Sequence, residues 1–218
     1  MMICPMSVYD ELKDKSIEEI KSAIRGFKQT IGKLKKKIEK ERFFPAEVYM
    51  CPSDDVVLSC TREFLEMAIK ALEEKGVKFQ RSQAVLKSLN FIIKLSEVDE
   101  IRLRIGAWCS PHRYCFNIAE QKVKKYMVFT CEDAELDASY DVDVDSFLYS
   151  LSELHLGEWK SYYSPSKFGV NILDGIQWCV GIKFRDGTKR MWSGDNDYPY
   201  NFDKLLELLE LNDIVREE

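Results

Sequence analysis

The sequence predicts an α+β fold, because a helical period near the N-terminus gives way to strand-like alternation and then to a hairpin. Apolar residues recur at intervals of three and four over residues 17–38, the spacing of one helical face. Residues 91–130 contain segments that alternate with a period of two, as in an antiparallel sheet. Further on, strand-like segments flank Asp186 and Gly187, a pair typical of a tight hairpin turn. We therefore expect a long N-terminal helix, a central antiparallel sheet with one or two helices, and a C-terminal β-hairpin flanked by helices.

The N-terminal helix is expected over residues 16–42, and it carries a narrow apolar stripe. Ser16 and Glu19 match a capping box, which fixes the start of a helix, and Pro45 follows its end. The stripe has coiled-coil spacing and consists of Ile17, Ile20, Ile24, Phe27, Ile31, Leu34 and Ile38. Lysines flank it, so a parallel homodimer would gain no ion pairs. We expect an acidic cover, either the chain's own C-terminal region or a protein partner, and we treat the stripe as an interaction helix for a partner or for self-association.

The chain divides into three segments by its patterns. We expect an N-terminal heptad helix over residues 1–45, an α+β antiparallel sheet region over 46–139 and a helix–hairpin–helix module over 140–218, merged into one body. A helix that Thr61 caps follows in the second segment, and a helix that Asp145 caps opens the third.

Strands are expected where apolar side chains alternate with polar ones. The second segment has four such stretches, at residues 91–95, 101–105, 114–118 and 126–130. In the third segment, residues 178–184 alternate strictly and lead into the Asp186–Gly187 turn. A leucine-rich acidic helix is expected over Asn201–Leu211.

Composition and charge favour a cytoplasmic globular protein. The chain has 218 residues, of which 45% are apolar, and no stretch approaches the ~20 apolar residues of a membrane span. Seven cysteines, an odd number spread along the chain, form no dense disulfide framework, so we expect reduced thiols. Residues 1–45 carry eleven cations against seven carboxylates, whereas residues 133–218 carry eight against eighteen. The two ends should therefore attract each other.

Several stretches resemble a module of uncharacterised bacterial proteins. Near the C-terminus these are Asp174–Val180, Phe184–Gly187 and Ser193–Phe202, the last of which contains the letters NDYPYNF. The stretches Ser7–Glu19 and Arg62–Gly76 are similar to the front of such proteins. The resemblance implies a shared architecture over most of the chain, and it implies no activity, cofactor or catalytic residue.

A C-x2-H-x2-C triplet at an expected hairpin turn is the sharpest candidate for chemistry. It consists of Cys109, His112 and Cys115, and thiolate and imidazole groups suit zinc. A structural zinc site needs a fourth ligand, for which Cys131 is available. The alternatives are a nucleophilic cysteine with a histidine base, and an ordinary turn with a surface histidine and two half-buried thiols. We prefer the ordinary turn.

A polar loop after the hairpin is the second candidate site. Asp195, Asn196, Asp197 and Tyr198 follow a serine–glycine pair, and functional residues concentrate on loops that a rigid scaffold holds. The competing interpretation is a turn whose side chains bond local backbone amides and cap the final helix. We prefer this structural interpretation.

Lysines gather in the second half of the long helix. They are Lys33, Lys35, Lys36, Lys37 and Lys40. They could grip phosphates, but the sequence pI is about 5.3, whereas nucleic-acid-binding domains are normally basic. We therefore expect a solvated helix face opposite an acidic protein surface.

Three functions remain open. The preferred one is a non-catalytic protein-interaction or regulatory module in the bacterial cytoplasm, without a cofactor. The second is a thiol- or metal-dependent enzyme that uses Cys109, His112 and Cys115. The third is a nucleic-acid-binding accessory protein that uses the basic N-terminal helix. The sequence contains no glycine-rich phosphate loop, G-x-S-x-G elbow or H-E-x-x-H helix.

Overall fold

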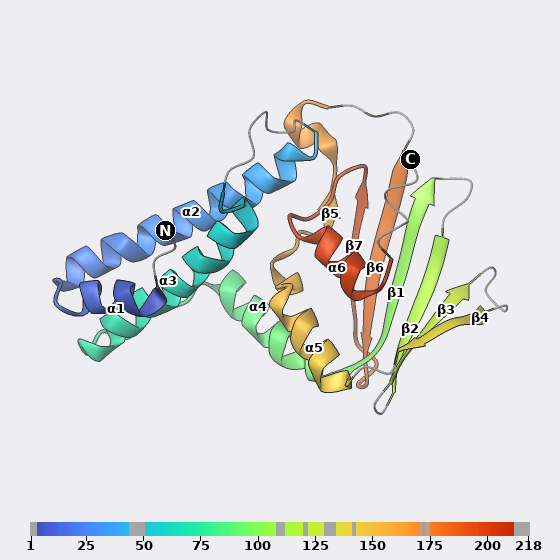
Figure 1. Ribbon diagram of the computed structural model, residues 1–218, viewed down its shortest axis with the longest axis horizontal. Helices are drawn as coiled ribbons and strands as arrows, with labels where there is room; N and C mark the ends of the chain where they lie inside the picture. The colour runs from blue at the N-terminus through green and yellow to red at the C-terminus, as the bar shows by residue number, and fades with distance from the viewer. Residues whose placement is uncertain are drawn as a thin grey trace. The chain divides into compact units, whose positions relative to one another are not determined.

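The chain forms two compact units, residues 1–81 and residues 82–218 (Figure 1). The computed structural model describes residues 4–43, 51–107, 112–119, 122–128, 134–140, 143–170, 172 and 175–211. The first unit is helical, and the second is built on one sheet. No helix in the described ranges combines the length and the apolar character that a membrane crossing requires.

Three helices make up the described part of the first unit: α1 (Pro5–Lys13), α2 (Ile17–Glu41) and α3 (Asp54–Glu74). The predicted long helix is confirmed, and its start is the predicted capping box. The Ser16 hydroxyl accepts a hydrogen bond from the Glu19 amide at 3.3 Å, and the Glu19 carboxylate accepts one from the Ser16 amide at 2.9 Å. Local sequence therefore sets where α2 begins.

Helix α3 covers the apolar stripe of α2. Ile20 and Ile24 are buried in a cluster with Ala68, Ile69 and Leu72 of α3. The other stripe residues, all half-buried, are Ile17, Phe27, Ile31, Leu34 and Ile38. Helix α3 thus covers the first half of the stripe within this unit.

The cover is acidic, as the flanking lysines predict, and it is a helix of the same unit. Helix α3 carries six carboxylates and two cations. One of the carboxylates, on Asp54, forms an ion pair with Lys37 at 2.6 Å. Phe27 of α2 and Phe64 of α3 lie with their ring centroids 6.0 Å apart. Apolar packing and charge therefore bring the same two helices together.

The start of α3 corrects one prediction. Thr61 does not cap a helix: it is buried in the middle of α3, and its hydroxyl donates a hydrogen bond to the Val57 carbonyl at 2.6 Å. The helix begins after Ser53, eight residues earlier. A threonine can satisfy its hydroxyl on the preceding turn, so its presence alone does not mark a helix start.

The described part of the second unit forms a seven-stranded mixed sheet with three α-helices, and the predicted α+β class is confirmed. The elements are α4 (Gln83–Lys94), β1 (Val98–Ala107), β2 (His112–Ala119), β3 (Lys122–Val128), β4 (Ala134–Tyr140), α5 (Val144–Glu153), β5 (Tyr162–Tyr163), β6 (Ile176–Phe184), β7 (Lys189–Asp195) and α6 (Phe202–Leu208). The strand order is β4-β3-β2-β1-β6-β7-β5, and all neighbours are antiparallel except β5 and β7. Strand β1 pairs with β2 on one side and with β6 on the other. This pairing joins the expected second and third segments into one sheet, whereas the two compact units of the chain divide between residues 81 and 82.

Two local predictions in this unit are also corrected. Residues 91–95 form the end of α4 and a following 3₁₀ turn instead of a strand, because a short continuous apolar run suits either structure. Phe91 packs edge-on against Trp192, with ring centroids 5.5 Å apart, and this tertiary contact fits the helix. Asp143, and not Asp145, caps α5, since its side chain accepts a hydrogen bond from the Asp145 amide at 3.1 Å.

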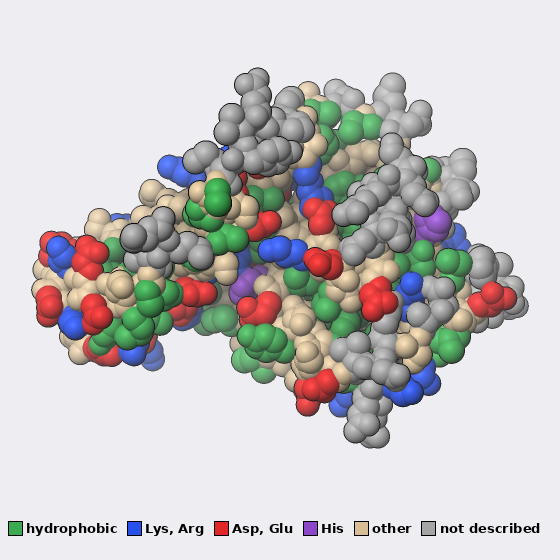
Figure 2. Space-filling model, viewed as in Figure 1, with side chains coloured by type: hydrophobic (Ala, Val, Ile, Leu, Met, Phe, Trp, Pro, Cys, Tyr) green, Lys and Arg blue, Asp and Glu red, His purple; other side chains and the backbone are tan. Residues whose placement is uncertain are grey.

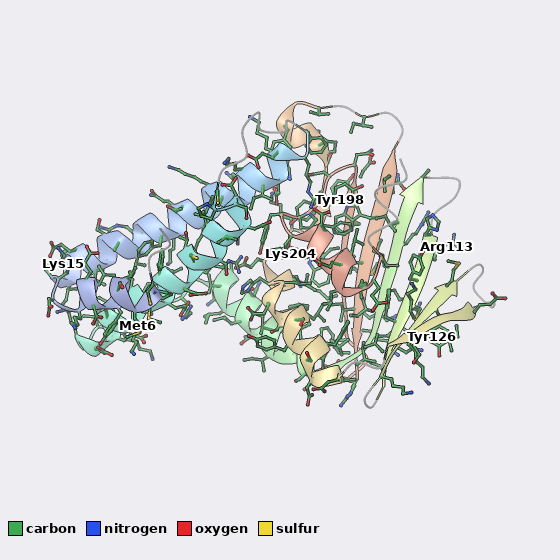
Figure 3. The ribbon with its side chains drawn as sticks, viewed as in Figure 1. Met6, Lys15, Arg113, Tyr126, Tyr198 and Lys204 are labelled. Carbon is green, nitrogen blue, oxygen red and sulfur yellow. The ribbon has the colours of Figure 1, made fainter. Side chains whose placement is uncertain are left out.

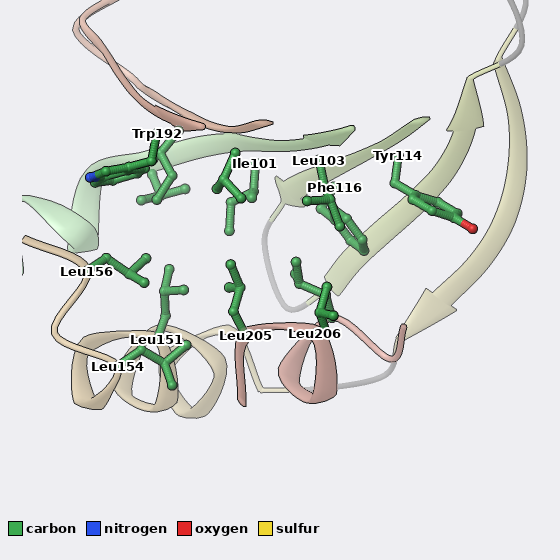
Figure 4. Packing of buried hydrophobic residues seen from close by; sticks show 14 of the residues in the cluster. Ile101, Leu103, Tyr114, Phe116, Leu151, Leu154, Leu156, Trp192, Leu205 and Leu206 are labelled. Carbon is green, nitrogen blue, oxygen red and sulfur yellow. The ribbon is translucent and has the colours of Figure 1, made fainter. Parts of the chain in front are cut away.

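The core of the second unit lies between one face of the sheet and the helices that cover it (Figure 4). Ile101, Leu103 and Phe116 point from the strands toward Leu151 of α5 and Leu205 of α6. All five side chains are almost completely buried. The opposite face of the sheet carries the alternate residues of the same strands, which are polar or partly exposed.

Candidate functional site

The C-x2-H-x2-C triplet is not assembled by strand β2. Cys109 and its proposed companion Cys131 lie outside the described residues. His112 and Cys115 are three positions apart in β2, and side chains alternate along a strand, so they point to opposite faces of the sheet. The His112 ring stacks on Tyr114, on the helix-covered face, whereas Cys115 is paired with Arg102 and Tyr126. With this geometry the two side chains cannot share one zinc ion.

Cys115 also has the wrong electrostatics for a nucleophile. Burial, with a smaller effect of the nearby Glu100 carboxylate, raises the pKa of the Cys115 thiol to about 11. Burial likewise raises the pKa of Cys179. Because their pKa values are raised, both thiols are protonated at neutral pH. They are therefore weakly reactive, since the thiolate is the reactive form. No group of three histidine, cysteine or carboxylate side chains suited to a metal occurs among the described residues.

We predict that Cys115 resists alkylation in the folded protein. A shift from the ordinary value of 9.0 to about 11 lowers the thiolate fraction at pH 7 roughly a hundredfold. Iodoacetamide labelling at pH 7, followed by peptide mass spectrometry, should modify the exposed Cys4 far faster than Cys115. Labelling of the denatured chain is the control, because both thiols should then react at similar rates. Equal rates in the folded protein would show that Cys115 is an activated thiol.

The start of the polar loop is fastened to the first hairpin strand. Asn196 has a left-handed backbone with φ of 54°, and its amide donates a hydrogen bond to the Ile176 carbonyl at 2.8 Å. The Asn196 side-chain oxygen accepts one from the Ile176 amide, and its side-chain nitrogen donates one to Asp195, both at 2.8 Å. A Cβ at Gly175 would lie 1.8 Å from that side-chain oxygen, so a larger residue there would displace the Asn196 side chain. The backbone amide, the side-chain oxygen and the side-chain nitrogen of Asn196 are therefore all hydrogen-bonded within the protein.

Asp197 lies inside the fold. Its side chain is fully buried, its carboxylate forms an ion pair with Lys167 at 2.7 Å, and one oxygen also accepts a hydrogen bond from the Tyr198 amide. Its carbonyl accepts a hydrogen bond from the Trp178 indole at 2.7 Å. Tyr198 in turn stacks on Trp178, with ring centroids 6.2 Å apart. The carboxylate of Asp197 thus points into the protein, which favours the structural interpretation of the loop.

The open face of the sheet offers a different site, one that sequence reasoning missed. Its residues alternate with the buried ones, and strand register places them in rows across the sheet. We define the open face by Glu100, Arg102, Arg104, Arg113, Cys115, Asn117, Lys124, Tyr126, Cys179, Gly181, Lys183, Lys189, Met191, Ser193, Tyr162 and Leu136. The central row runs from Tyr126 through Cys115, Arg102 and Gly181 to Met191. Figure 3 shows Arg113 and Tyr126 on β2 and β3 of this sheet.

Positive charge dominates the open face. Six of the residues just named are cations and one, Glu100, is a carboxylate; the pairing of Asp195 with Gln177 places a second carboxylate on this face, at the end of β7. Glu100 forms an ion pair with Arg102, whose side chain is still 71% exposed, and Asp99 at the adjacent bulge pairs with Lys183 at 2.9 Å. By contrast, acidic side chains are visible over α5 and α6 (Figure 2), which together carry four carboxylates and one cation. The basic face is thus a local feature of an acidic chain.

Large apolar side chains lie at the two ends of the open face. Met191 and Tyr162 near one edge are 61% and 56% exposed, and Leu136 on β4 is also exposed. Exposed apolar groups among cations are typical of a surface that contacts another molecule. The sequence signal was present in β1, where arginines occupy the positions between buried aliphatic residues. These arginines form a basic surface only together with the residues of the neighbouring strands, which the sequence of β1 alone does not identify.

Comparisons with known proteins leave the site to be interpreted from its geometry. Scans of the chain against family models, against curated proteins and against solved structures each return no match. The resemblance to uncharacterised bacterial proteins therefore stays a prediction.

Proposed function

We propose that the protein is a non-catalytic interaction module that binds an acidic protein surface through the open face of its sheet. The observation that supports this most is the excess of cations on that face, with Arg102, Arg104 and Arg113 adjacent across β1 and β2. A cationic surface attracts acidic partners and speeds their encounter. Exposed Met191 and Tyr162 would add apolar contacts at the edge. We place this interaction in the bacterial cytoplasm as part of the same proposal.

A protein partner is favoured over single-stranded nucleic acid by the position of the aromatic residues. Sheets that bind such strands stack bases on aromatic side chains of their central strands. Strands β1 and β6 are described in full, and neither presents an aromatic side chain on the open face. Tyr126 and Tyr162 lie on β3 and β5, with four strands between them. Two bases cannot stack side by side on such widely separated rings.

The enzyme alternative receives less support from the same face. A thiol-dependent reaction would need a thiolate, whereas burial holds Cys115 and Cys179 in the protonated form. Their partner across the strand in each case is an arginine of β1, which suits charge recognition. Binding is therefore the function that the arrangement supports best.

Charge reversal on the open face tests the proposal. We expect Arg102→Glu/Arg104→Glu to weaken binding of a fluorescently labelled poly-glutamate peptide by about tenfold or more, because attraction becomes repulsion. Fluorescence anisotropy of the full chain at several salt concentrations measures this, with circular dichroism as a check of folding. The matched control is Lys75→Glu/Lys87→Glu, which reverses two exposed charges that lie outside the sheet and should change affinity less than about twofold.

Two outcomes would contradict the proposal. Equal losses in the two double variants would mean that net charge, and not the open face, governs binding. Tighter binding of an oligothymidylate of matched charge number would favour the nucleic-acid alternative.

A further inference from the structure

A shallow groove with a basic rim runs along α2 in the first unit. Its volume is about 350 Å³, within the range of small-molecule sites. The lining consists of Lys21, Ile24, Arg25, Lys28, Leu72, Val77, Lys78, Phe79 and Gln80, and we name it the basic groove. All of these residues belong to residues 1–81.

The floor and one wall of the basic groove are apolar. Ile24 and Leu72 form part of the core between α2 and α3, and Val77 and Phe79 are half-buried in the chain that follows α3. This segment, residues 77–81, is held in place at both ends. The Val77 amide donates a hydrogen bond to the Leu72 carbonyl at 3.3 Å, and Arg81 forms two hydrogen bonds with the Glu66 carboxylate, at 3.0 and 2.8 Å. The wall is therefore anchored before any ligand arrives.

Four cations form the rim, and none of the described lining residues is a carboxylate. Lys28 lies over the Phe79 ring, with its nitrogen 4.5 Å from the ring centroid, and so links the two walls. Lys21 has a carboxylate partner, Glu18, at 3.0 Å, on the helical turn before it. Arg25 and Lys78 are exposed on opposite walls. An anion between these walls would meet positive charge from both sides.

We propose that the basic groove binds a small amphipathic anion, with a carboxylate or phosphate head and a linear apolar tail of about eight carbons. The head would lie between Arg25 and Lys78, and the tail would cover Val77 and Phe79. From Lys21 to Lys28 the helix rises about 10 Å, which matches the length of such a tail and is short for a peptide segment. A site with cations around an apolar floor favours a ligand that has both a charged head and an apolar tail. A neutral alkyl chain would not form ion pairs with the cations, and a small free anion would not bury apolar surface on the floor.

Titration of the full chain with octanoate, followed by amide chemical shifts in NMR spectra, tests the proposal. We expect saturable shifts at residues 21–28 and 77–80, and at least tenfold weaker binding of 1-octanol and of inorganic phosphate. Arg25→Glu/Lys78→Glu should weaken octanoate binding at least tenfold. Lys33→Glu/Lys36→Glu reverses two exposed charges on α2 outside the groove, and it should change the affinity less than twofold.

Octyl phosphate should bind at the same residues, and its affinity relative to octanoate distinguishes a phosphate from a carboxylate head. Equal affinity for octanoate and 1-octanol, equal losses in the two variants, or shifts that map elsewhere would overturn the proposal. So would a glutamate-rich peptide that shifts the same amides where octanoate does not. None of these outcomes depends on the open face of the sheet, so the two proposals stand or fall separately.

Discussion

Replacing Trp178 with alanine should lower the free energy of unfolding of the second unit by about 3–5 kcal/mol. The indole is 2% exposed and lies at the centre of an aromatic cluster. Its ring centroid is 4.7 Å from that of Phe202, 5.9 Å from that of Tyr163 and 6.2 Å from that of Trp159. Truncation would remove these contacts and leave a cavity that the sheet and α6 cannot fill. Chemical denaturation monitored by circular dichroism measures the loss.

Two further variants separate the causes of this effect. Trp178→Phe keeps a ring in place but removes the hydrogen bond to the Asp197 carbonyl, so it should cost about 1–3 kcal/mol. Tyr162→Ala removes an aromatic ring that is 56% exposed at the sheet edge, and it should cost less than about 1 kcal/mol. A loss below 1 kcal/mol for Trp178→Ala would mean that this face of the hairpin is not packed against α6.

The hairpin around Trp178 shows what local sequence can determine. Strict alternation in residues 178–184 assigns the buried face, and the structure buries Trp178, Val180, Ile182 and Phe184. The turn is equally local, since Gly187 has a φ of 81°, which glycine adopts without strain. Helix α2 is also determined by local sequence, because the capping box lies at its start and its apolar spacing involves residues only three or four positions apart.

Contacts between distant residues could not be predicted in the same way. Strand β1 pairs with β6 although more than 70 residues separate Ile105 from Trp178. The sequence pattern of either strand does not identify the strand with which it pairs. Residues 91–95 fit a strand or a helix equally well until Phe91 meets Trp192 and Phe184. Tertiary packing selected the helix, as it often does for short apolar runs.

The candidate site was hidden for the same reason. Arg104 is unremarkable in its own strand, and it becomes part of a basic surface only when register places Arg113 on one side of it and Cys179 on the other. The pair His112 and Cys115 shows the opposite case. Its sequence spacing suggested proximity, whereas the pleat of β2 sends His112 and Cys115 to opposite faces.

The second large effect is expected in the helical unit, where Ile24→Asp should destabilise the packing of α2 on α3 by about 3–5 kcal/mol. Ile24 is 3% exposed and packs in the cluster that contains Ala68 and Leu72. A carboxylate there would be removed from water without a partner, and it would also face the acidic helix α3. Hydrogen exchange of the full chain, read at the peptides that cover α2 and α3, measures the loss of protection.

The matched control is Gln29→Asp, because Gln29 is exposed on the same helix and receives the same charge. It should change the protection of α2 and α3 by less than about 0.5 kcal/mol, the usual size of a surface substitution. If Ile24→Asp were as mild as Gln29→Asp, the stripe would face solvent in the isolated protein. The interaction helix that the lysine-flanked heptads first suggested would then regain its place, because an uncovered stripe of this length needs a partner. A clear difference between the two variants would instead fix α3 as the cover, and it would leave the basic groove beside Ile24 as the surface of α2 through which this unit can bind.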